Sequence, residues 1–233
     1  MSSREPKPLR HHKGWASRGY LPHFDAGKLV QAITFRLADS LPKTIYDDIT
    51  ATAANDADIR RRIEAMIDGG RGACVLRNPR IAAIVQDALW HFDGEHYRLI
   101  AWAIMPNHVH VLMEQIEGHL LADVVHAWKS FSAKEANKLL RRTGKFWAAD
   151  YFDRYIRDQS HFDAAVNYIH ENPVKAGLVA RADVWRWSSA WNGVAGTALR
   201  HTFARLRMRN VSLEYSATCH HRYWSPRKAI IDS

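Results

Sequence analysis

The sequence has little cysteine, no long apolar run and no internal repeat. Its 233 residues include two cysteines, Cys74 and Cys219. Two cysteines are too few for a disulfide framework, so we expect a reduced, cytoplasmic setting. No stretch reaches the roughly eighteen apolar residues of a membrane-spanning helix, and the polar first residues do not resemble a signal peptide. Hydrophobic residues at 47% and charged residues at 24% exclude global disorder, a coiled coil and a collagen-like fibre.

Acidic residues are outnumbered, and the imbalance lies at the two ends. The chain has 33 Lys and Arg against 24 Asp and Glu, a formal net charge of +9. Residues 1–28 hold six basic and two acidic side chains, and residues 181–233 hold nine and three. This excess is typical of a protein with a nucleic-acid partner. Nine tryptophans among the arginines suit single-stranded nucleic acid, although a basic protein with core tryptophans is the alternative.

Strands and helices alternate without the regular spacing of a parallel sheet. We expect an α+β fold, with an antiparallel sheet and helices on one or both of its faces. Strands are predicted over residues 29–37, 99–105 and 108–114, the last two forming a hairpin. Helices are predicted over residues 42–68, from 79, over 119–142 and over 160–172. We divide the chain into a basic arm (1–28), a central domain (29–190) and a basic extension (191–233).

Two histidines in the second hairpin strand are candidate metal ligands. His108 and His110 are two residues apart, so both imidazoles lie on one face of a strand. Two adjacent imidazoles can hold a divalent cation. About one such pair is expected by chance among fourteen histidines, so a structural pair is the alternative.

A tyrosine and an amide in the last predicted helix form a second candidate pair. Tyr168 and Asn172 are four residues apart and therefore share one helix face. A phenol is a poor nucleophile at neutral pH, but a divalent ion that polarises a phosphodiester would lower the barrier to its attack. A packing tyrosine followed by a helix-ending asparagine is the alternative. Tyr151 and Tyr155 are rival nucleophiles, without an amide one helical turn away.

The two motifs together resemble the HUH single-tyrosine transposases. Residues 102–113 (WAIMPNHVHVLM) resemble their paired strands, and residues 168–179 (YIHENPVKAGLV) resemble their tyrosine helix and the turn after it. Residues 18–24, 30–37 and 147–154 are similar to the branch called REP-associated tyrosine transposases. The resemblance covers roughly residues 15–190, so residues 29–190 correspond to the catalytic domain of that family.

This resemblance implies a fold, a reaction and a set of site residues. The family fold is a ferredoxin-like α+β domain, and its members cut single-stranded DNA at or near hairpin-forming repeats. The resemblance makes Tyr168 the nucleophile, which forms a 5′-phosphotyrosine and releases a 3′-OH before the strands are joined. It makes His108, His110 and Asn172 the ligands of Mg²⁺ or Mn²⁺. The implied setting is the cytoplasm, at the nucleoid, with no membrane partner and with a monomer and a homodimer both open.

Several basic or polar residues are candidate DNA contacts. The helix after the hairpin and the two ends of the domain supply Arg18, His23, Lys129, Ser130, Lys134 and Arg154. The extension after Trp191 is expected to clamp the DNA backbone through its cations. The alternative is an ordered segment that covers the active site.

Two further functions remain open from the sequence. One is a DNA-binding protein that recognises repeat hairpins without catalysis. The other is a metal-dependent phosphodiesterase that uses water, with Tyr168 in a structural role. A covalent protein–DNA adduct would separate the transposase-like function from both.

Overall fold

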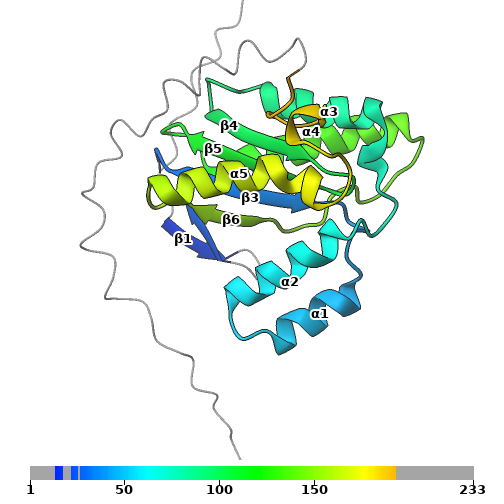
Figure 1. Ribbon diagram of the computed structural model, residues 1–233, viewed down its shortest axis with the longest axis horizontal. Coiled ribbons are helices and arrows are strands. Elements are labelled where there is room, and N and C mark those ends of the chain that lie inside the picture. Colours follow the sequence, from blue (N-terminus) through cyan, green and yellow to red (C-terminus); the bar gives the residue numbers. More distant parts are fainter. Residues whose placement is uncertain (1–13, 18–21, 26, 193–233) are drawn as a thin grey trace, which may run out of the picture.

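A four-stranded antiparallel sheet forms the centre of the computed structural model, which describes residues 14–17, 22–25 and 27–192 (Figure 1). The strands lie in the order β4-β5-β3-β6. Their bounds are β3 Val30–Arg36, β4 Tyr97–Ile104, β5 His108–Gln115 and β6 Phe152–Tyr155. Helices connect β3 to β4 and β5 to β6, and β4 and β5 form a hairpin. This is the ferredoxin-like arrangement, so the predicted fold class is confirmed.

Helices cover both faces of the sheet. The five α-helices are α1 Lys43–Thr52, α2 Asp56–Asp68, α3 Pro79–Trp90, α4 Leu121–Leu139 and α5 Gln159–Lys175. In Figure 1, α5 crosses one face while α3 and α4 lie behind the other, and α1 and α2 lie beside β6. Two short 3₁₀ helices, Val75–Arg77 and Ala182–Val184, complete the described elements. No described helix has the length and apolar character needed to cross a membrane.

The alternation of β5 assigns its side chains to two different layers. Val109, Val111 and Met113 pack into the cluster shared with α3 and α4. Leu112 packs with α5, and His108 and His110 lie on that same face because side chains two apart point the same way. The strand therefore carries a hydrocarbon face and a face with the candidate ligands.

Two departures from the expected elements change the neighbourhood of the site. The helix predicted over 42–68 is two helices, because residues 53–55 break it and Asn55 caps α2 by accepting from the Asp58 N–H. The final helix begins earlier than expected, with Asp158 as its N-cap. It also runs through Pro173 to Lys175. A proline in the last turn removes one backbone hydrogen bond and is tolerated there, so the expected end at Asn172 is wrong.

Part of the expected N-terminal arm is a β-hairpin. β1 (Gly14–Ser17) and β2 (Pro22–Asp25) pair in antiparallel register, and β2 lies beside β6. These short strands were not predicted, because their residues lack an alternating apolar pattern. The division of the chain at residues 28 and 190 remains a prediction. Residues 193–233 of the C-terminal extension and Arg18 lie outside the described residues, as does the His23 side chain.

Candidate metal and nucleophile site

The two histidines face each other in the buried layer between the sheet and α5. His108 and His110 are 1% and 2% exposed, and their Nε2 atoms are 2.9 Å apart. Burial and the neighbouring His108 hold the pKa of His110 well below its usual value, so its imidazole is neutral at pH 7. The neutral imidazole is the form in which histidine binds a metal.

Neighbouring groups orient both rings. The Asn107 amide nitrogen donates to the backbone carbonyls of Ile67 and Arg71, each at 2.9 Å. Its oxygen is therefore the atom 2.7 Å from His108 Nδ1, so Nδ1 donates to it and Nε2 faces the site. His110 Nδ1 lies 2.9 Å from the hydroxyl of Thr34, its partner on β3. Such outer partners commonly fix the orientation of metal-binding histidines.

Asp68 joins the histidines from a different element, and the sequence analysis missed it. Its Oδ1 lies 3.3 Å from His108 Nε2, and ligand atoms of these three residues all lie within 4.8 Å of one another. The bonds from Asn107 to residues 67 and 71 hold the end of α2 against the hairpin. A carboxylate forty residues before the histidines carries no local motif, so only the fold reveals it.

Tyr168 and Asn172 meet the histidines from α5. The Tyr168 ring lies edge-on to His110, with centroids 5.3 Å apart, and Asn172 donates a hydrogen bond that lowers the Tyr168 pKa. Asn172 is 1% exposed, and its Oδ1 has no hydrogen-bond partner among the described residues. A buried amide oxygen that accepts no hydrogen bond lowers the stability of the folded protein, unless a ligand binds to it. The four residues singled out from the sequence thus lie together.

The unpaired oxygen and the converging nitrogens fit a divalent cation. Two ligands on neighbouring corners of a six-coordinate ion, with bonds of about 2.1 Å, are about 3.0 Å apart. The two Nε2 atoms have that spacing. The donors are two imidazoles, a carboxylate and an amide oxygen, a mixture that suits Mn²⁺ and is compatible with Mg²⁺.

Carboxylates make the surroundings of the tyrosine negative. Burial is the main cause that raises the pKa of Tyr168, followed by the charges of Glu64 and Asp68, and these outweigh the Asn172 hydrogen bond. Glu64 lies one helical turn before Asp68 on α2, and burial raises its pKa to about 7. The protein alone therefore disfavours the phenolate form of Tyr168.

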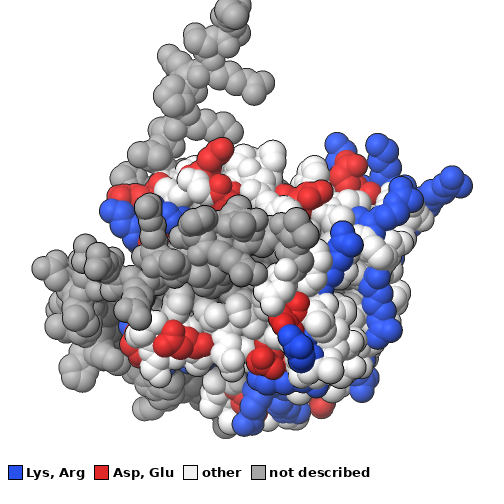
Figure 2. Space-filling view, turned by 45° about the horizontal axis from the view of Figure 1, so that its top comes forward, with Lys and Arg blue, Asp and Glu red and all other residues white. Residues whose placement is uncertain are grey.

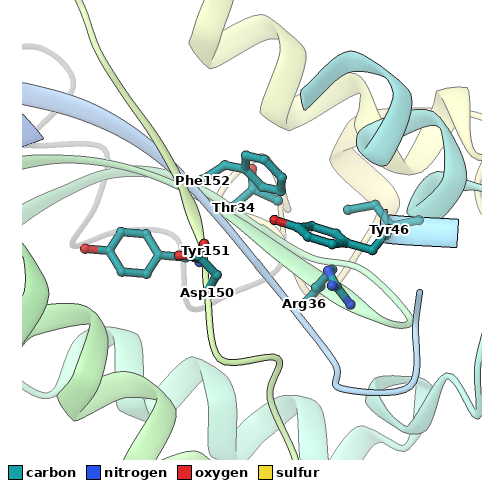
Figure 3. Close-up of a pocket in the computed structure, with 7 residues that line it drawn as sticks. Thr34, Arg36, Tyr46, Asp150, Tyr151 and Phe152 are labelled. Carbon is teal, nitrogen blue, oxygen red and sulfur yellow. Dashed lines mark hydrogen bonds between the residues drawn. The ribbon is translucent and has the colours of Figure 1, made fainter. Parts of the chain in front are cut away.

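A recess adjoins the histidines on the β3 side (Figure 3). Thr34, which contacts His110, lines it together with Arg36, Tyr46 and Phe152. The Arg36 guanidinium lies 5.9 Å from the centre of the Tyr46 ring. Burial lowers the Arg36 pKa, although arginine remains charged. An arginine among aromatic rings offers contacts to both phosphate and base.

The predicted DNA contacts whose side chains the structure describes lie on two elements, α4 and β6. Arg154 is exposed on β6, and Ser130 and Lys134 are exposed on α4, in the layer opposite Tyr168. Lys129 donates to the Ala149 carbonyl at 2.9 Å, and burial lowers its pKa to about 8. Figure 2 shows Lys and Arg gathered along the right-hand side of one face, with acidic groups interspersed elsewhere. The structure brings none of the α4 residues to the histidines.

The rival tyrosines point elsewhere. Tyr151 is 9% exposed and packs in the cluster of the α3–α4 face. Tyr155 follows Arg154 on β6 and pairs with Gln31, so it points to the opposite face from Ala32 and Arg154. Ala32 packs in the cluster that includes Tyr168. Among the described tyrosines singled out from the sequence, Tyr168 is the one in contact with a candidate ligand.

Comparisons with known proteins find similarity to transposases. Residues 78–172 match the family described as "Transposase IS200 like". An Escherichia coli REP-associated tyrosine transposase is 25% identical over 99 residues, which are 42% of this chain and 58% of that protein. A Haemophilus influenzae protein of the same description is 28% identical over 107 residues, 41% of this chain and 61% of that protein. The resemblance to REP-associated tyrosine transposases is confirmed.

The match to the transposases has clear limits along the chain. It spans about three fifths of the length of these relatives. The IS200-like match contains His108, His110, Tyr168 and Asn172 but not Asp68. A solved REP-associated tyrosine transposase bound to a REP hairpin is 16% identical with a TM-score of 0.49, over 72% of this chain and 79% of that one.

Proposed function

We propose that this chain is a metal-dependent single-stranded DNA endonuclease and strand transferase that acts at hairpin-forming repeats through a 5′-phosphotyrosine. The observation that carries the proposal is the contact between Tyr168 and His110, which puts a candidate nucleophile beside a candidate metal site. The transposase relatives support the reaction class. The hairpin as substrate is taken from the description of one solved relative and from the family resemblance.

The reaction consists of one displacement and its reversal. Tyr168 Oη attacks the scissile phosphorus, a bond forms between them, and the bond from phosphorus to the 3′ oxygen breaks. The phenolic proton is lost to solvent and the departing 3′ oxygen takes one from solvent, so no net proton is consumed. In the second step, the 3′-OH of another strand attacks the phosphotyrosine and restores the phenol.

The residues of the site have separate tasks in this scheme. His108, His110, Asp68 and Asn172 would hold the Mg²⁺ or Mn²⁺, which when bound withdraws charge from the phosphodiester. Asn107 and Thr34 keep the imidazole rings oriented. The Asn172 amide nitrogen hydrogen-bonds Tyr168 while its oxygen is left for the ion. One amide thereby sets the tyrosine relative to the metal.

A covalent adduct tests the proposal. We expect the full chain, incubated with end-labelled single-stranded hairpin DNA and Mn²⁺, to form a labelled band that survives denaturing electrophoresis. Tyr168→Phe removes one hydroxyl, so DNA binding and the melting temperature should be retained while the adduct disappears. Tyr151→Phe is the matched control, because that tyrosine lies in the other layer, and its adduct should equal that of the wild type.

The two alternative functions predict different results in the same electrophoresis experiment. Binding without adduct or cleavage by the wild type would select a non-catalytic repeat-binding protein. Metal-dependent cleavage that persists in Tyr168→Phe and leaves no adduct would select a phosphodiesterase that uses water.

A further inference from the structure

Lys175 joins the face of α5 that carries the nucleophile. Because the helix continues through Pro173, Tyr168, Asn172 and Lys175 follow at spacings of four and three residues and lie on one side. The Lys175 ammonium lies 5.1 Å from the centre of the Tyr168 ring. The ring of the proposed nucleophile is therefore contacted both by His110 and by a lysine.

Lys175 does not form an ion pair with the glutamate one helical turn before it. Glu171 lies four residues earlier, the spacing at which a glutamate and a lysine pair along a helix. No carboxylate among the described residues lies within ion-pair distance of the Lys175 ammonium. The side chain is exposed at its end of the helix, so the cation is accessible to a ligand. An unpaired cation held over a tyrosine is typical of a site for a negatively charged group.

The charge of the site shows which group the lysine would meet. Glu64 and Asp68 act on Tyr168 with negative charge, so an approaching phosphodiester is repelled unless cations offset them. A divalent ion at the histidines supplies positive charge on one side of the nucleophile. The reacting phosphate gains negative charge in the transition state, where a fixed cation is most effective. Lys175, whose ammonium lies 5.1 Å from the centre of the Tyr168 ring, can supply such a cation.

We propose, resting on the function above, that Lys175 binds a non-bridging oxygen of the scissile phosphodiester and is a second cationic group of the reaction centre. Its ammonium keeps its proton throughout, and no bond to the lysine forms or breaks. The assignment rests on the course of α5, which continues to Lys175, and on the contact of the ammonium with the Tyr168 ring.

The binding test is made in a Tyr168→Phe background, which keeps the aromatic ring but cannot cleave. The DNA is the hairpin strand cut by the wild type, with either a phosphodiester or an uncharged methylphosphonate at the scissile linkage. We expect Lys175→Met to weaken binding of the charged DNA about tenfold in Mn²⁺, and to change binding of the uncharged DNA little. Lys138→Met, at an exposed lysine in the last turn of α4, should affect neither.

The kinetic test uses the protein with Tyr168 intact. At saturating DNA, Lys175→Met should slow adduct formation about 100-fold while the affinity for Mn²⁺ is unchanged, and Lys175→Arg should restore part of the rate. Equal losses on both DNAs, or none on either, would overturn the assignment. If the wild type forms no adduct at all, the proposed function fails first. If it does and the lysine variants behave as wild type, only the role of Lys175 is wrong.

Discussion

The two faces of β5 are both buried, but they differ in whether the protein supplies every hydrogen bond of their polar side chains. Val109 and Val111 are fully buried toward α3 and α4, and His108 and His110 are almost as buried toward α5. On the first face, Trp128 Nε1 donates to Tyr97 Oη at 2.8 Å, and Tyr97 Oη donates to the Leu89 carbonyl at 2.7 Å. The protein itself therefore supplies hydrogen-bond partners for both of these buried side chains.

The second face leaves oxygen atoms unpaired. Oδ1 of Asn172 and Oδ1 of Asp68 are buried without a hydrogen bond, the latter 3.3 Å from His108 Nε2. On the first face, the buried Gln31 and Gln115 have partners, and Trp102 Nε1 is the side-chain atom of the described hydrophobic cluster that has no hydrogen bond. Indole nitrogens only donate, whereas these oxygens accept and can bind a cation. The first face therefore serves packing, and the second face offers buried oxygen atoms that can bind a cation.

Exchanging one residue on each face of β5 should give the sharpest contrast. We expect His110→Ala, or EDTA added to the wild type, to lower adduct formation at least 100-fold, because the ion loses a ligand or is removed. Val111→Ala should keep the activity of the folded protein but lower the free energy of unfolding by about 2 kcal/mol, because it opens a cavity. Adduct assays and urea unfolding measure the two effects.

Either of two results would contradict this difference between the two faces of β5. Full activity in EDTA would remove the metal from the second face. A His110→Ala variant that unfolds more easily than Val111→Ala would mean that the histidine serves packing.

The next effect concerns the two ligands from different helices. Asp68→Asn should weaken Mn²⁺ binding about ten- to 100-fold, since a carboxylate charge is lost while the shape is kept. Asn172→Ala should weaken it less, because an amide oxygen is a neutral ligand. Calorimetric titration of the DNA-free protein with Mn²⁺ measures both, with the exposed Asp48→Asn on α1 as the control. Equal affinities for Asp68→Asn and the control would leave Asp68 outside the site.

The smallest effect concerns stability against pH. Glu64 has a raised pKa of about 7 in the folded protein, so the folded state binds more protons than the unfolded state between its ordinary value and pH 7. Stability then falls as pH rises through this window, and the cost is complete above pH 7. In metal-free protein, Glu64→Gln should raise the free energy of unfolding by about 2 kcal/mol at pH 8 and by little at pH 4.5. A pH-independent difference would contradict this origin.

Local patterns predicted much of the fold and three of the four proposed metal ligands, His108, His110 and Asn172. Period-two alternation gave β3 and β5, and helical spacing gave α3 and α4. The histidine pair and the tyrosine–asparagine pair were visible because each lies within one element. The end of α5 was predicted wrongly, because the local preference of a residue before proline yielded to tertiary packing of the helix on the sheet. Because the helix was expected to end at Asn172, the position of Lys175 on the same helix face as Tyr168 was not predicted.

The amino-acid sequence by itself determined which side chains share a face, because strand and helix periods are properties of the local backbone. It therefore placed His108 with His110, and Tyr168 with Asn172. Only the tertiary structure decided that these two faces meet across β5 and α5, and that Asp68 and Glu64 approach from α2. Contacts between residues far apart in the chain depend on sheet order and helix packing, which no short spacing encodes.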